Sequence, residues 1–256
     1  MTTATMTEEK LEIGRVIQET FAVLGRNFAT FFVLALILTG LPTAIVGVLQ
    51  MEAARANTVA GWSWFLVTGL ISGVMAMVLQ GALIFGTIND LNGRRVSVSD
   101  SLTIGLRNFL GLFAVSLLYG LAVGFGTLLL IVPGIMIAVA WCAAVPALIA
   151  ERIGIMDTFG RSAQLTRGNR WRIFGLFLVY VLVFIAITMV VGLVAGVAGV
   201  IGDTSTDDIT PAQIVINVVT NVISGLIGAT GAAVLYTELR RVREGATPDA
   251  LAAIFD

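Results

Sequence analysis

Residues 108–150 read NFLGLFAVSLLYGLAVGFGTLLLIVPGIMIAVAWCAAVPALIA and contain no Asp, Glu, Lys or Arg over 43 positions. A helix of roughly 20 apolar residues crosses a bilayer core about 30 Å thick. This run is therefore long enough to cross a membrane twice. Pro133-Gly134 is the simplest place for the reversal, because a Pro-Gly pair ends a helix and permits a tight turn. We expect spans over 108–131 and 134–150.

Four more uncharged runs flank this one, over residues 27–51, 56–89, 173–202 and 209–237. Each predicts one span, at about 27–50, 62–88, 173–201 and 211–237. The chain of 256 residues is 57% hydrophobic and 12% charged, whereas soluble domains carry about 25% charged residues. The sequence predicts an all-α, polytopic membrane helix bundle with six transmembrane helices, in a single integral membrane domain over 1–256.

The basic residues fall almost entirely on one side of this six-span arrangement. Short loops rich in Lys and Arg stay cytoplasmic, and one side holds 14 of the 15 basic residues. These are Lys10, Arg15, Arg26, Arg94, Arg95, Arg107, Arg152, Arg161, Arg167, Arg170, Arg172, Arg240, Arg241 and Arg243. The other side holds Arg55 alone. A five-span chain would separate the arginines of 151–172 from the rest, so we expect six spans, with both termini and the tail 238–256 in the cytoplasm.

The chain contains an internal repeat. Residues 19–28 (ETFAVLGRNF) align without a gap to residues 100–109 (DSLTIGLRNF), and the same elements return within 157–174 with eight extra residues. Each copy has an acidic residue, a hydroxyl residue, an apolar stripe, an arginine and a phenylalanine that enters the next span. The repeat groups the six spans as three hairpins, each preceded by a cytoplasmic amphipathic helix. The first such helix lies within 1–26, which lacks the features of a cleaved signal peptide.

Apolar residues at helical spacing predict these three amphipathic helices. The expected apolar faces are Ile13, Val16, Ile17, Phe21 and Leu24 in the first, Val98, Leu102 and Gly105 in the second, and Met156, Phe159 and Ala163 in the third. Such helices lie in the headgroup layer or dock under the bundle. They position the next span or, alternatively, bind a partner.

Small residues four apart mark places for close approach between helices. The pairs are Gly69–Gly73, Gly192–Gly196 and Ser224–Gly228. They predict packing within the chain or, alternatively, a homodimer. Pro42 and Pro146 each remove a backbone hydrogen bond and predict kinks in the first and fourth spans.

Few polar groups lie inside the spans, and none of them is ionisable. Gln80, Asn217 and Asn221 are the candidate intramembrane polar contacts. Ionisable residues in spans usually mark ion or proton pathways, so a coupled transporter is disfavoured. The two asparagines lie one turn apart and either bridge helices by hydrogen bonds or bind a solute.

No histidine occurs in the chain, which removes the commonest general base and zinc ligand. Among the acids only Asp203, Asp207 and Asp208 cluster, as a solvated outside loop or a weak cation site. The single Cys142 supplies neither a disulfide nor a thiolate cluster. We therefore expect no enzyme activity, no metal, no cofactor and no nucleic-acid partner.

The densest group of charged side chains lies in residues 151–175. Four arginines stand beside a tryptophan at the expected cytoplasmic interface: Arg161, Arg167, Arg170 and Arg172, with Trp171. Guanidinium groups bind phosphates through paired hydrogen bonds, and basic clusters beside a span bind anionic lipids. These five residues are candidate lipid headgroup contacts, although anchoring of the topology alone also requires arginines here.

A wider pattern includes this segment: Pro133-Gly134-Ile135, Trp141, Pro146, Glu151, Gly154, Arg161-Ser162 and the run LTRGNRWRIFG over 165–175. This pattern resembles the membrane domain of glycerophosphoryl diester phosphodiesterases. The resemblance implies a six-span helical domain of the bacterial cytoplasmic (inner) membrane, found alone or fused to a catalytic barrel. The fused enzyme uses histidines and metal-binding carboxylates of that barrel, and this chain has neither barrel nor histidine, so the activity is not carried over. Ala140 stands where similar sequences often have an arginine.

We therefore expect a non-catalytic integral membrane protein that is a membrane scaffold or a lipid-interacting accessory domain. Membrane phospholipids are the expected partners, with a homo-oligomer or another membrane partner as further options. The alternative function is a facilitative transporter or channel for a small neutral or amphipathic solute, with a path near Gln80, Asn217 and Asn221.

Overall fold

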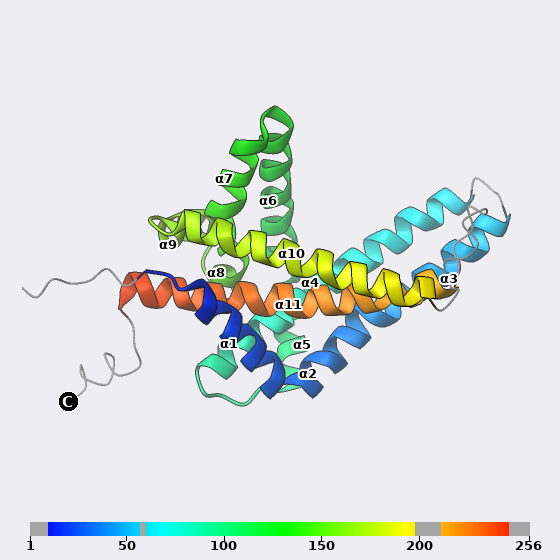
Figure 1. Cartoon of the computed structure of the whole chain (residues 1–256), viewed down its shortest axis with the longest axis horizontal. Coiled ribbons are helices and arrows are strands. Elements are labelled where there is room, and N and C mark those ends of the chain that lie inside the picture. The colour runs from blue at the N-terminus through cyan, green and yellow to red at the C-terminus, as the bar shows by residue number, and fades with distance from the viewer. Residues whose placement is uncertain (1–9, 57–59, 198–210, 246–256) are drawn as a thin grey trace, which may run out of the picture.

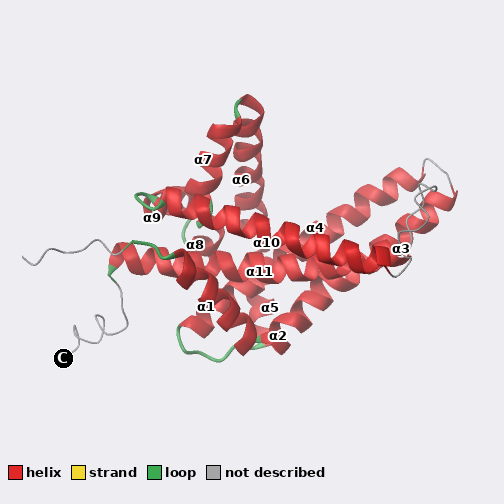
Figure 2. Ribbon diagram, in the orientation of Figure 1, coloured by secondary structure: helices red, strands yellow, loops and turns green. Residues whose placement is uncertain are grey.

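The computed structural model describes residues 10–56, 60–197 and 211–245, and every regular element within these ranges is a helix (Figure 2). In chain order they are α1 (Ile13–Arg26), α2 (Phe28–Ala35), the π-helical turn η1 (Leu36–Gly40), α3 (Leu41–Ala56), α4 (Ala60–Leu91), α5 (Val98–Arg107), α6 (Phe109–Leu129), α7 (Ile131–Trp141), α8 (Ala144–Glu151), α9 (Ile155–Thr166), α10 (Arg170–Val197) and α11 (Pro211–Glu244). The predicted all-α fold is confirmed.

Within the described ranges, six helical segments are long and apolar enough to cross a membrane. They are Phe28–Met51, Val67–Leu91, Phe109–Leu129, Ile131–Glu151, Arg170–Val194 and Gln213–Glu244. The predicted number of spans is confirmed, and the run 108–150 provides two of them. α11 continues to Glu244, so residues 238–244, which we expected in the C-terminal tail, are helical. The continuation is stable because Leu239 is fully buried against the core.

The helix ends that carry arginine, except the end of α3 with Arg55, gather on one side of the molecule. In Figure 1, α1, α5, α9 and the C-terminal end of α11 lie toward the left and bottom, whereas the α6–α7 hairpin points to the top and α3 to the right. α10 lies beside α11. We call the side with α1, α5 and α9 the basic side.

The core surrounds the C-terminal half of α11. Its largest fully buried side chains include Tyr236 and Leu239 of α11, Leu83 of α4 and Leu165 of α9. Much of the remaining surface is apolar and exposed. The tip of the α6–α7 hairpin, residues 128–132, is 66–82% exposed, and the most apolar stretch of α10 buries none of its residues in the protein. Soluble proteins rarely expose apolar patches of this extent, so this surface requires lipid around it.

The chain reverses between α6 and α7 at Leu130, three residues before the predicted Pro133-Gly134 turn. α6 ends at Leu129, Leu130 is extended, and α7 begins at Ile131. Pro133 thus lies in the first turn of α7, where a backbone N–H has no partner within the helix. Gly134 serves close packing instead, because a Cβ there would lie 2.1 Å from Thr127 Oγ1 and 2.7 Å from the Thr127 backbone nitrogen.

Both prolines that predicted kinks follow a helix irregularity. Pro42 is the second residue of α3 and comes after the π-helical turn η1. Pro146 is the third residue of α8 and follows the break between α7 and α8 at Cys142-Ala143. In each case the helix deviates about one turn before the ring, where a proline clashes with the carbonyl of residue i−4.

The three short helices bury faces that differ from the expected apolar stripes. α1 buries Val16, Thr20 and Val23, α5 buries Ser101 and Gly105, and α9 buries Thr158, Phe159, Ser162, Leu165 and Thr166. Phe21 and Met156 of the expected stripes are 54% and 73% exposed. Small and hydroxyl residues occupy the buried faces because they let neighbouring helices approach closely.

Asn27 and Asn108, which align in the sequence repeat, make the same contact at the start of a span. The Asn27 amide donates to the Val23 carbonyl (3.1 Å), and the Asn108 amide donates to the Ile104 carbonyl (2.9 Å). Asn27 also donates to Asp90 of α4 (2.7 Å). Each asparagine side chain thus gives a second hydrogen bond to a carbonyl that also accepts the asparagine's own backbone N–H, at the C-terminal end of the helix before it.

Arg26, next to Asn27, also joins α1 to α4. Its guanidinium pairs with Asp90 at 2.7 Å and with Glu19 at 3.0 Å. The hydrogen bonds to Asp90 and to Glu19 raise the pKa of Arg26 above its ordinary value. The charge of Arg26 therefore serves the contact between α1 and α4.

Of the predicted small-residue pairs, Gly69–Gly73 does not bring described helices of this chain together. A Cβ at Gly69, Gly73 or Gly192 would meet no atom within 4 Å in the part of the chain that the structure describes, and the surroundings of Gly196 are not described. Gly228 faces Tyr180 of α10, with 3.2 Å between the Cβ position and the hydroxyl. A closer crossing, which the sequence did not predict, joins Gly105 of α5 to α4.

Candidate functional site

The segment that carries the family resemblance is folded around the break between α7 and α8. The Ala140 carbonyl and the Ala143 N–H flank this break, and α9 supplies hydrogen bonds to both. Ser162 Oγ accepts from the Ala143 N–H (3.1 Å) and donates to the Ala140 carbonyl (2.9 Å). Thr166 Oγ1 also donates to the Ala140 carbonyl, at 3.2 Å. Because an unsatisfied backbone group inside a membrane is costly, these hydroxyls stabilise the kinked span.

One ring contact and one backbone turn hold α9 under this span. The rings of Trp141 and Phe159 pack with centroids 4.6 Å apart and planes tilted by 52°. The link between α8 and α9 turns sharply, because Arg152 adopts a left-handed conformation with φ of 51°. Together they fix α9 at the basic end of α8.

A chain of ion pairs ties α8, α9 and α11 together. Arg161 Nε donates to both carboxylate oxygens of Glu151, at 2.8 and 2.9 Å, and the Tyr236 hydroxyl donates to the same carboxylate at 2.7 Å. Arg161 also pairs with Glu244, which accepts from Arg240 at 2.8 Å. The side chains of Arg161 and Glu151 are only 24% and 18% exposed, so these ion pairs have a structural role.

The segment before α1 crosses the loop between α9 and α10. The Leu11 N–H donates to Asn169 Oδ1 at 3.2 Å, and Arg172 Nη1 donates to the Leu11 carbonyl at 2.6 Å. Leu11 itself is 1% exposed. The loop 167–169 and the first residues of α10 therefore anchor the N-terminal part of the described chain.

The five candidate headgroup contacts divide into two sets. Arg161 and Arg172 make hydrogen bonds within the protein, although Arg172 is also exposed. Arg167, Arg170 and Trp171 are exposed, Trp171 by 85%. Within the described residues, the guanidinium groups of Arg167 and Arg170 have no carboxylate partner. These two arginines can bind an external anion.

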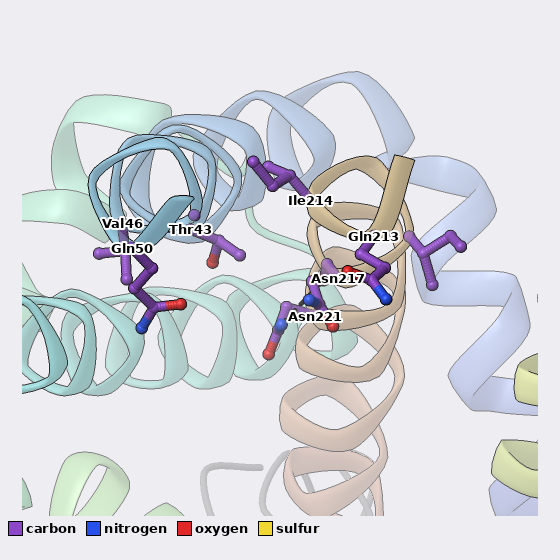
Figure 3. Close-up of a pocket in the computed structure, with 9 residues that line it drawn as sticks. Thr43, Val46, Gln50, Gln213, Ile214, Asn217 and Asn221 are labelled. Carbon is purple, nitrogen blue, oxygen red and sulfur yellow. Dashed lines mark hydrogen bonds between the residues drawn. The ribbon is translucent and has the colours of Figure 1, made fainter. Parts of the chain in front are cut away.

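The candidate intramembrane polar residues are not brought together. Gln80 lines an apolar cavity of about 400 Å³ among α1, α4, α6, α8, α10 and α11. Asn217 and Asn221 line a different, open recess of about 390 Å³ between α3 and α11. Figure 3 shows both asparagines and Gln213 on one helix, with Gln50 on the facing helix.

The amide of Asn221 donates to the Asn217 carbonyl one turn earlier, at 2.8 Å. This bond lies within α11 and joins no other helix. In the part of the chain that the structure describes, no group of three His, Cys, Asp or Glu residues is placed to hold a metal ion. The acidic cluster Asp203, Asp207 and Asp208 lies outside the described residues.

A sequence model of one protein family matches residues 112–239, half of the chain. That family is described as the membrane domain of glycerophosphoryl diester phosphodiesterase. The chain belongs to this family. Searches of the curated proteins and of the solved structures found no match. The matched family is the membrane domain of the enzyme and not its catalytic domain, and with six apolar helices the chain is a multi-pass membrane protein.

In this glycerophosphoryl diester phosphodiesterase membrane domain, several matched residues that define the resemblance have structural roles. Ser162 and Thr166 bond the broken span, and Glu151 pairs with Arg161. Sequence reasoning did not predict these contacts. One signal was present, because a proline inside a span frees backbone groups that nearby Ser or Thr side chains commonly satisfy. No signal linked Glu151 to Tyr236, which is 85 residues away.

Proposed function

We propose that this membrane domain is a non-catalytic scaffold or lipid-interacting accessory domain that contacts the headgroups of anionic phospholipids on its basic side. The observation that carries the proposal is the exposed group Arg167, Arg170 and Trp171 at the start of α10. Directly after it, α10 becomes an apolar helix whose most apolar stretch buries no residue in the protein. Tryptophan and arginine at the end of a span are typical of the membrane interface.

The two remaining candidate residues, Arg172 and Arg161, have different roles in this proposal. Arg172 holds the Leu11 carbonyl through one N–H, and its guanidinium keeps further donors for a phosphate. Arg161 is engaged by Glu151 and Glu244 and positions α9. We therefore assign headgroup contact to Arg167, Arg170, Trp171 and Arg172, and a supporting role to Arg161.

In the proposed orientation the basic side faces the cytoplasm of a bacterium, the protein lies in the inner membrane, and both termini are cytoplasmic. The support is the charge bias, with 14 of 15 basic residues in segments assigned to one side. Figure 1 is consistent with it, because α1, α5, α9 and the C-terminal end of α11 lie toward the same side. Positive loops are retained in the cytoplasm.

Removing the two exposed guanidinium groups should lower the retention of anionic lipid. In the double variant Arg167→Ala/Arg170→Ala, the number of phosphatidylglycerol molecules that stay bound in mild detergent should fall several-fold, because two charge-assisted contacts to phosphate are lost. Native mass spectrometry counts the bound lipids. The control Arg94→Ala/Arg95→Ala removes the same charge from the exposed loop between α4 and α5. Equal retention in wild type and in the 167/170 variant contradicts the proposal, and so does equal loss in both variants.

The transport alternative needs one path that passes Gln80, Asn217 and Asn221. Gln80 lines one cavity and the asparagines line another. This separation favours the lipid-contact proposal over a shared solute path. The non-catalytic part of the proposal is supported by the absence of histidine from the sequence and by a family match to the membrane domain alone.

A further inference from the structure

The cavity of about 400 Å³, which we call the chamber, lies at a similar depth on the helices that line it. Its walls include Gln80 of α4, Tyr119 of α6, Pro146 of α8, Tyr180 of α10 and Ala232 of α11. With a rise of 1.5 Å per residue, these positions lie about 8–18 Å from the basic ends of their helices. All five residues belong to the apolar spanning segments, so we place the chamber within the hydrocarbon layer, in the half next to the basic side.

The walls of the chamber are mostly apolar. Its volume falls in the range of roughly 300–1,000 Å³ that is usual for ligand sites, which combine apolar walls with a few polar groups. The Gln80 amide and the Tyr180 hydroxyl line it, and neither makes a hydrogen bond with the described residues. Such a space suits a hydrocarbon chain better than a polar solute, which would need many more partners.

α1 covers the basic end of the chamber. Val16 and Phe21 of α1 contribute to the lining, and Phe21 is 54% exposed. α1 meets α10 closely, because a Cβ at Gly175 would lie 3.3 Å from Ile13 Cδ1. This end of the chamber therefore lies at the membrane interface, where an amphipathic helix sits.

A cationic group stands at the same end. Leu176 of α10 lines the chamber, and Arg172 lies four residues before it. Residues i and i+4 share one face of a helix, so Arg172 is one turn above the chamber on the face that lines it. Beyond the chamber, the apolar stretch of α10 buries no residue in the protein, so a chain from the surrounding bilayer has access alongside this helix.

We propose that the chamber holds one acyl chain of a membrane phospholipid, whose phosphate lies at the basic end near Arg172. This inference rests on the proposed lipid-contact function and specifies where the hydrocarbon part of the lipid goes. Depth in the membrane, apolar walls, access along α10 and a positive charge at the mouth all match this occupant. The chamber selects for a chain, whereas Arg167 and Arg170 select for headgroup charge.

Trp141 lines the chamber and reports on its contents. In the variant Trp62→Phe/Trp64→Phe/Trp171→Phe, Trp141 is the remaining one of the four tryptophans. Bromine on an acyl chain quenches tryptophan fluorescence at short range. Titration of this variant in detergent with phosphatidylcholine brominated on one acyl chain should give quenching that saturates near one lipid per protein. Quenching that rises in proportion to added lipid, with no saturation, overturns the proposal.

Filling the chamber should remove the saturable quenching. Ala232→Leu adds a larger side chain to the wall, and Gly228→Leu is a second filling variant at a position 3.2 Å from the Tyr180 hydroxyl. Gly192→Leu is the control, because a Cβ there meets nothing within 4 Å. Each is placed in the single-tryptophan background and checked for a monodisperse size-exclusion profile. We expect loss of the saturable component in the filling variants and its retention in the control; saturation unchanged in a monodisperse filling variant overturns the proposal.

The same titration distinguishes the chamber proposal from the headgroup-contact proposal. Phosphatidylcholine has no net charge, so its saturable quenching should persist in Arg167→Ala/Arg170→Ala. Saturable quenching together with unchanged phosphatidylglycerol retention in that variant would refute the headgroup proposal and leave the chamber standing. Lost phosphatidylglycerol retention without saturable quenching would refute the chamber and leave the headgroup proposal standing.

Discussion

Replacing Gly105 by alanine should lower the stability of the protein sharply, although the change adds only one methyl group. A Cβ at this position would lie 2.5 Å from the Val78 carbonyl oxygen and 3.2 Å from the Ala82 nitrogen. Both are backbone atoms of α4, which cannot rotate away as a side chain can. Overpacking typically costs about 1–3 kcal/mol, and we expect the upper end of this range here.

The measurement is thermal unfolding in detergent, followed by the loss of the monomer peak in size-exclusion chromatography. A loss of about 3 kcal/mol lowers the melting temperature of a chain of this size by roughly 6–12 °C. Gly120→Ala in α6 is the matched control, because a Cβ there meets nothing within 4 Å. Alanine favours a helix over glycine by up to about 1 kcal/mol, so the control should melt at the same temperature or higher. Equal melting temperatures for the two variants would show that α4 and α5 do not cross at Gly105.

Glu151→Gln should give the second large loss of stability. Glu151 accepts two hydrogen bonds from Arg161 and one from Tyr236. Exposed ion pairs contribute up to about 1 kcal/mol, and breaking a buried pair costs about 3–5 kcal/mol. The Arg161 and Glu151 side chains are 24% and 18% exposed, so we expect a loss of about 2 kcal/mol.

This loss corresponds to a fall of roughly 4–8 °C in melting temperature. Glu19→Gln is the control, because Glu19 is 37% exposed and its partner Arg26 keeps the shorter ion pair to Asp90. It should melt within about 1–2 °C of wild type, since one exposed pair is worth little. If Glu151→Gln melts as the control does, the ion-pair chain does not hold α8, α9 and α11 together.

The number of spans and the single basic side followed from the sequence because charge is excluded from the bilayer core, whatever the helices pack against. The exact residue at which the 108–150 run reverses did not follow from the sequence. Pro133-Gly134 looked like a turn, but the chain reverses at Leu130 because Gly134 packs against Thr127. That contact joins two helices, and no local rule of turn chemistry describes it.

The buried faces of the short helices also depended on their neighbours. α9 buries Ser162 and Thr166, which bond a broken helix beside them, and exposes Met156. Helical spacing alone assigned Met156 to the apolar face of this helix and did not include the two hydroxyls. Similarly, the sequence did not distinguish Arg161 from the other three interfacial arginines. In the structure Arg161 pairs with Glu151 and Glu244.

The resemblance predicted the family but not the roles of its residues. Pro146, Ser162, Thr166, Glu151 and Arg161 build the kinked fourth span and its support. The exposed residues of the same segment, Arg167, Arg170 and Trp171, are those to which we assign headgroup contact. A motif can thus combine residues that build a fold with residues that face its surroundings, and burial with hydrogen bonding separates the two.

A structure of the full chain in nanodiscs containing phosphatidylglycerol tests the account most directly. We predict a lipid phosphate within hydrogen-bonding distance of Arg167 or Arg170, beside Trp171, and an acyl chain in the chamber next to Trp141. Arg167 and Arg170 without any lipid phosphate nearby, together with a chamber closed by side chains or open to water, would contradict it.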